Sequence, residues 1–274
     1  MVQQVKNFAR RHGCGLFVFL ALSLLSLALH RSRVINLIHC QVYSGLTLFA
    51  VLLFLASFNA RKKLPFLPLL QASTWMQIHI YVGWFSVVLL FIHMEYRMPS
   101  GPLNTTLAIL FAVVSVSGII GLWISRTFPQ RLTWRGENVI FERIPAIRFQ
   151  LKQEIAALAR KAVMESSSSA IGDFYVTQLK DFFDGPRHVV SHILSSNKPR
   201  HRLLSSAEAI QRYLSPEECN QLQDIMELVR LKDDLDHQYA LQGTLKCWLF
   251  VHIPFTYGLL LLAAFHGLIA LAMT

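Results

Sequence analysis

The sequence predicts an all-α membrane protein, a five-helix transmembrane bundle with a mainly helical cytoplasmic insertion. Two observations lead to this fold class. Hydrophobic residues make up 53% of the 274 residues and charged residues only 15%, whereas a soluble domain carries about 25% charged residues. The apolar residues also gather in runs close to the roughly 20 residues that a spanning helix needs, and the mean hydropathy is +0.41.

Five apolar runs are expected to span the membrane, near residues 15–30, 43–60, 77–94, 104–125 and 248–272. The first run could instead be a signal peptide, because basic residues precede it, but "LALHRSR" is a poor cleavage site. We therefore keep it as a helix. The chain then divides into helices one to four in residues 1–125, an insertion in residues 126–247, and a fifth helix in residues 248–274.

Lys and Arg predict the orientation of the bundle. Basic clusters precede the first run and follow the second, whereas the insertion is nearly balanced in basic and acidic residues. We expect the N-terminus and the insertion in the cytoplasm and the C-terminus outside. The formal net charge of +10 therefore lies mainly at the edges of the lipid bilayer. No basic-aromatic array suggests a nucleic-acid partner.

The insertion has the composition of a soluble segment. Residues 126–149 contain two prolines and a short apolar stretch, which predict a turn and one or two strands. Helices are expected from about Gln150, around residues 174–183 and around residues 207–214. The sequence "SPEE" at Ser215–Glu218 predicts a capped helix that continues almost to the fifth span. A segment this long is expected to dock a partner.

An acidic cluster of Asp233, Asp234 and Asp236 is followed by His237. Such a run is most often the solvated face of a helix. Delivery of protons to a quinone, or contact with a partner protein, are the alternatives.

Four histidines lie in two of the predicted spans, His79 and His93 in the third and His252 and His266 in the fifth. Fourteen residues separate the members of each pair, which corresponds to about 21 Å along a helix and about 40° short of four turns. The two spans run in the same direction, so His79 matches His252 in depth, and His93 matches His266. Two imidazoles at each level could bind the axial positions of one haem iron. A single histidine in a membrane helix can also bond to a carbonyl or line a proton path.

The motifs "H79-x13-H93" and "H252-x13-H266" resemble those of the membrane di-haem cytochromes b, which include quinol-oxidising cytochromes b and the ferric reductase/NADPH oxidase membrane domain. The resemblance implies two b-type haems that carry electrons across the bilayer. Covalent attachment is not expected, because no C-x-x-C-H motif is present. The sequence differs from ferric reductases in showing no sixth helix and no G-x-G-x-x-G phosphate loop. A redox partner protein or a quinone, within a complex, is therefore expected to exchange the electrons.

Three further residues are candidates for cofactor binding. Gly83 lies about 40° round the helix from His79, where a porphyrin could approach the backbone. Arg97 and Arg126 could bind the anionic propionates, although interfacial anchoring explains most such residues. The protein is thus predicted to be an electron-transfer component of an oxidoreductase. The alternative is a membrane transporter or structural subunit that uses the histidines as proton or metal sites.

Overall fold

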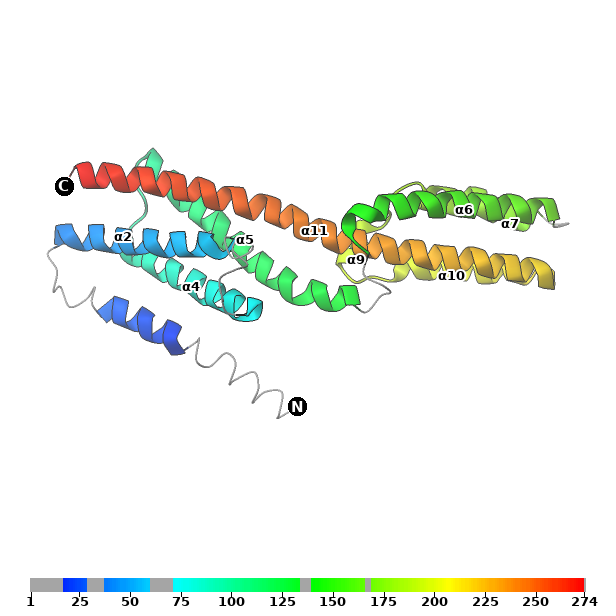
Figure 1. The fold of residues 1–274 in the computed structure, drawn as a ribbon, viewed down its shortest axis with the longest axis horizontal. Coiled ribbons are helices and arrows are strands. Elements are labelled where there is room, and N and C mark those ends of the chain that lie inside the picture. The colour runs from blue at the N-terminus through cyan, green and yellow to red at the C-terminus, as the bar shows by residue number, and fades with distance from the viewer. Residues whose placement is uncertain (1–16, 29–36, 60–70, 134–138, 166–168, 274) are drawn as a thin grey trace. The chain divides into compact units, whose positions relative to one another are not determined.

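The computed structural model describes residues 17–28, 37–59, 71–133, 139–165 and 169–273. Within these ranges the chain is helical and contains no strand, so the prediction of an all-α protein is confirmed there. A short helix, Phe17–Ala28, comes first. The remaining elements, labelled where there is room in Figure 1, are α2 (Leu37–Ala56), η1 (Ser57–Asn59), α4 (Ala72–His93), α5 (Pro102–Thr133), η2 (Phe141–Arg143), α6 (Ile144–Glu165), α7 (Ala170–Phe174), the π-helical turn η3 (Tyr175–Leu179), α8 (Lys180–Phe183), α9 (Val189–Ile193), α10 (Lys198–Gln211) and α11 (Pro216–Ala272).

Three helices in the described part of the chain, α4, α5 and α11, are long and apolar enough to cross a membrane. Only 22% of the most apolar window of α5 and 6% of that of α11 are buried within the protein. Apolar surface of this extent is compatible with a lipid bilayer. The apolar helices Phe17–Ala28 and Gln41–Ala56 are shorter, so the predicted count of five spans is not confirmed. The basic clusters at residues 6–11 and 61–63, which underlie the predicted orientation, lie outside the described residues.

The chain forms two compact units, and both α5 and α11 contribute to each of them. The first unit comprises residues 1–122 and 249–274, and the second comprises residues 123–248. In the first unit α2 packs alongside α4 (Figure 1). Its core draws one or two side chains from each of four helices, namely Leu48, Leu52, Leu89, Phe111 and Leu259. The apolar character of these helices thus produces both a shared interior and an uncovered exterior.

A tight turn ends α4 and fixes it to α2. Glu95 and Tyr96 both lie in the left-handed region of backbone conformation, with φ of 49° and 59°. Residues other than glycine rarely adopt this conformation. Gln41 of α2 donates a hydrogen bond through Nε2 to Oε1 of Glu95, at 3.0 Å. This bond ties the end of α4 to α2 two residues beyond His93.

In the second unit, α6, α7, α8 and α10 pack on the first part of α11 around a core that includes Ile155, Phe183 and Ile225. The predicted capping box is confirmed. The backbone N–H of Glu218 donates to Oγ of Ser215 at 3.3 Å, and the N–H of Ser215 donates to Oε2 of Glu218 at 2.8 Å. From this cap α11 runs without a break for 57 residues, so the helix predicted to end just before the fifth span continues through that apolar run.

The strands predicted for residues 126–149 are wrong for the described part of that segment. Helix α5 continues to Thr133 with Pro129 inside it, although proline removes one helical hydrogen bond. The neighbouring Phe128 is fully buried against Ile124 and Leu241, and this burial favours the longer helix. Further along, η2 and α6 occupy residues 141–165.

The acidic run on α11 is not the solvated face that the sequence suggested. Asp233, Asp236 and His237 are 3%, 0% and 4% exposed, and the neighbouring Lys232 is fully buried. The Lys232 ammonium pairs with the Asp236 carboxylate and donates to the carbonyl of Gly185 at 2.7 Å. Burial lowers the pKa of Lys232 and raises the pKa of Asp236. Most of the run is therefore a buried charge network inside the second unit, whereas Asp234 is partly exposed and pairs with Arg200.

Candidate functional site

The four histidines lie on two stripes of the first unit, one along α4 and one along α11. The residue midway between each pair is buried, since Ser86 is 4% exposed and Leu259 is 3% exposed. Seven residues correspond to about 20° short of two helical turns, so each midpoint shares the stripe of its histidines. Both stripes therefore face the interior of the bundle, and the histidines themselves are half-buried.

The structure brings both predicted pairs of histidines together. The ring centres of His93 and His266 are 6.3 Å apart, with 86° between the ring planes. His79 and His252 lie near each other at the other end of the two stripes. The ring of Phe58 lies 4.9 Å from that of His79. We refer to these pairs as the His79–His252 level and the His93–His266 level.

The spacing at the His93–His266 level fits two axial ligands of one iron. An imidazole nitrogen binds a metal at about 2 Å and lies roughly 1.1 Å from its ring centre, so two such rings have centres about 6 Å apart. Rings that share one axis can take any angle between their planes. In the described part of the chain no group of three or more His, Cys, Asp or Glu could hold a metal ion. Two histidines at this spacing could hold a haem, whose porphyrin supplies the other four ligands.

Two serines from neighbouring helices contact the histidine rings. Oγ of Ser44 on α2 lies 3.2 Å from Nδ1 of His93, and Oγ of Ser117 on α5 lies 2.6 Å from Nδ1 of His252. One histidine at each level is thus held by a hydroxyl. The histidine motif predicts neither serine, because spacing along α4 and α11 carries no information on their neighbours. Their position within apolar runs is the only sign of them in the sequence.

Gly45, next to Ser44, is the glycine that approaches a histidine most closely among those described. A Cβ added there would lie 2.9 Å from Cε1 of His93, which is closer than real Cβ atoms come. The predicted Gly83 has no atom within 4 Å of such a Cβ, so it adjoins open space rather than a side chain. Gly118 is intermediate, with Cε1 of His252 at 3.9 Å.

The two predicted propionate ligands lie on the exposed surface. Arg97 follows the turn at the end of α4, four residues beyond His93. Arg126 lies on α5 within the second unit. Arg97 is thus the one that belongs to the same unit as the histidines.

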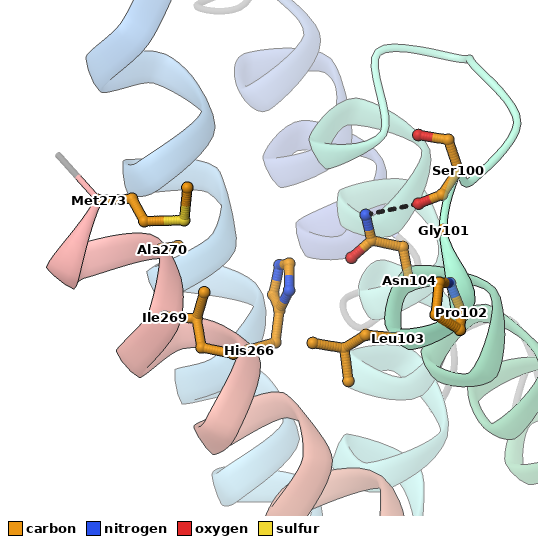
Figure 2. A pocket seen from close by; sticks show the side chains of 9 residues that line it. All are labelled: Ser100, Gly101, Pro102, Leu103, Asn104, His266, Ile269, Ala270 and Met273. Atoms are coloured by element: carbon orange, nitrogen blue, oxygen red, sulfur yellow. Dashed lines mark hydrogen bonds between the residues drawn. The ribbon is translucent and has the colours of Figure 1, made fainter.

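A cavity of about 320 Å³ opens beside His266. Figure 2 shows the His266 ring between α11 and the start of α5, with Leu103 and Asn104 opposite. Asn104 donates through Nδ2 to the carbonyl of Ser100 at 3.0 Å. The volume is at the lower end of the roughly 300–1,000 Å³ of small-molecule pockets. The cavity therefore borders the His93–His266 level on the side of His266.

No family model, curated protein or solved structure matches this chain.

Proposed function

We propose that this protein is a di-haem b-type cytochrome, a member of the membrane di-haem cytochromes b, that carries electrons across a membrane. The observation that supports the proposal most is the meeting of four histidines in two pairs on the same two helices. At one level the ring centres are 6.3 Å apart, as two axial ligands of one iron require. The equal spacing of fourteen residues on both helices gives the second level the same register.

Two b-type haems held by these histidines would supply one-electron redox chemistry through their iron. The chain's own residues do the rest. His79 and His252 hold one group, and His93 and His266 hold the other. Buried apolar side chains such as Leu259 keep water away from the space between the levels. The two levels are about 21 Å apart along the helices, which suits an apolar layer of about 30 Å.

The proposed orientation places the N-terminus and the second unit in the cytoplasm and the C-terminus outside. A redox partner protein or a quinone exchanges electrons with the levels, and the protein acts as one component of a complex. The second unit, with its own core, provides a surface for such a partner.

The decisive experiment is a reduced-minus-oxidised absorption spectrum of the full chain, purified in detergent from cells supplied with haem. We expect a sharp b-type α-band and close to two haems per chain by the pyridine haemochrome assay. A colourless, folded protein would refute the proposal. It would favour a transporter or structural subunit in which the histidines are proton or metal sites.

Histidine variants test the division into two levels. His93→Ala should remove one haem and leave the spectrum of the other largely intact, and His79→Ala should do the reverse. His201→Ala is the matched control, because His201 is exposed on α10 in the second unit. Equal loss of both haems in every membrane variant, with folding preserved, would contradict the two-level arrangement.

A further inference from the structure

We infer that Ser44 and Ser117 are positioning residues that set the tautomers of His93 and His252. In each ring Nε2 then carries the lone pair that would bind the haem iron. This inference rests on the proposed function and deepens it, because it assigns a role at the same site to two residues outside the histidine motif.

The hydrogen bonds of the two serines determine which group donates the proton. A hydroxyl has one proton to donate. Ser44 donates it to the carbonyl of Gln41 at 3.0 Å, and Ser117 donates it to the carbonyl of Val114 at 2.9 Å. With each hydroxyl proton directed to its carbonyl, the ring donates from Nδ1 to the serine oxygen. Both His93 and His252 therefore carry a proton on Nδ1 and a lone pair on Nε2.

A ring in this tautomer is prepared to bind a metal. A hydrogen bond from the second ring nitrogen fixes the orientation of a histidine ligand and raises its basicity. At the His93–His266 level, the adjacent Gly45 also leaves the space that the His93 ring occupies. The dipeptide Ser44-Gly45 thus supplies both a hydrogen-bond acceptor and room for one ring.

The two levels are anchored by different helices, which makes the inference testable one level at a time. Ser44 belongs to α2 and contacts a histidine of α4, whereas Ser117 belongs to α5 and contacts a histidine of α11. Loss of one hydroxyl should therefore change one level and leave the other unchanged.

The experiment is a redox titration of the haem-loaded full chain with Ser44→Ala and Ser117→Ala. A less basic ligand favours the reduced iron, so each variant should raise the midpoint potential of one haem, and a different one in each case. Loss of such a bond typically costs about 10–100-fold in metal affinity. A tenfold greater loss for the oxidised than for the reduced form corresponds to about 59 mV. Ser44→Thr and Ser117→Thr keep the hydroxyl and should restore the potentials.

Ser86→Ala is the matched control. Ser86 is a buried serine of α4 that donates to the carbonyl of Gly83 at 2.7 Å, as Ser44 and Ser117 donate to carbonyls three residues earlier. Both potentials should stay unchanged in this variant. A shift as large as that in Ser44→Ala would overturn the inference, because it would show a general effect of removing buried hydroxyls.

Nitrogen NMR of histidine-labelled protein without haem tests the tautomers directly. The expected result is protonated Nδ1 on His93 and His252, with the preference lost only for His93 in Ser44→Ala. A wild-type chain that binds no haem but shows these tautomers would refute the proposed function and leave the positioning role intact. A chain that binds two haems, with potentials unchanged in both alanine variants, would refute the positioning role alone.

Discussion

Replacing Gly45 by alanine should displace the ring of His93. The added Cβ would lie 2.9 Å from Cε1 and 3.3 Å from Nδ1 of His93, whereas ordinary contacts begin at 3.4 Å. Either the ring moves by about half an ångström or α2 and α4 separate by a similar distance, because a closely packed interior has no free space for the added methyl group. Both changes strain the contact between His93 and Ser44.

The cost can be estimated from the two effects of the substitution. Overpacking typically costs about 1–3 kcal/mol, and alanine in place of a helical glycine returns up to about 1 kcal/mol. We expect a net loss of about 1–2 kcal/mol in unfolding free energy without haem. If the displaced His93 ring weakens haem binding by the same free energy, haem affinity at the His93–His266 level should fall roughly 5–30-fold.

Thermal unfolding of the detergent-purified chain, followed by circular dichroism, measures the stability, and haem titration measures the affinity. Gly258→Ala is the control, since a Cβ at this position of α11 meets nothing within 4 Å. It should be neutral or slightly stabilising. Unchanged stability together with full haem binding at both levels in Gly45→Ala would refute the reasoning.

Three further substitutions test other parts of the molecule. Gly83→Ala places its Cβ in open space, so it should stabilise the haem-free chain by up to about 1 kcal/mol. The same substitution should lower haem content at the His79–His252 level. Unchanged haem content would show that Gly83 is not part of the site. Lys232→Met should destabilise the chain by about 3–5 kcal/mol in thermal unfolding, because it leaves Asp236 buried without its ammonium partner, and adding Asp236→Leu should recover much of the loss. A double variant as unstable as the single one would contradict that explanation. Ala270→Phe should fill the cavity beside His266 and slow reoxidation of the reduced protein by a water-soluble quinone with its spectrum intact, whereas an unchanged rate would exclude this entrance.

The features that the sequence predicts are those set by the period of a single helix. Fourteen residues place His79 and His93 on one stripe of α4 wherever that helix packs. The cap at Ser215 and Glu218 is equally local, since its two reciprocal bonds join residues three apart. Such features depend on backbone geometry that every helix shares.

The features that the sequence did not predict depend on contacts between segments far apart in the chain. Ser117 and His252 are 135 residues apart, and no pattern on either helix records their meeting. Asp236 accepts from the backbone N–H of Arg187, 49 residues earlier, so a run that is polar by composition became buried. The prolines of residues 126–149 predict a turn, but Pro129 lies within α5, because Phe128 beside it is buried against Leu241, which is far along the chain.

The placement of one histidine of each pair on α11 has a consequence for biosynthesis. A ribosome releases α4 long before α11, so His79 and His93 are synthesised well before their opposite rings. Neither level is complete until α11, the last of the candidate spans along the chain, docks against its neighbours. The 33 residues of α11 that precede Leu249 belong to the second unit, and a helix extends readily once its first turns have formed. Folding of that unit would thus prepare the final span, and both levels would become ready for cofactor in one late step of assembly.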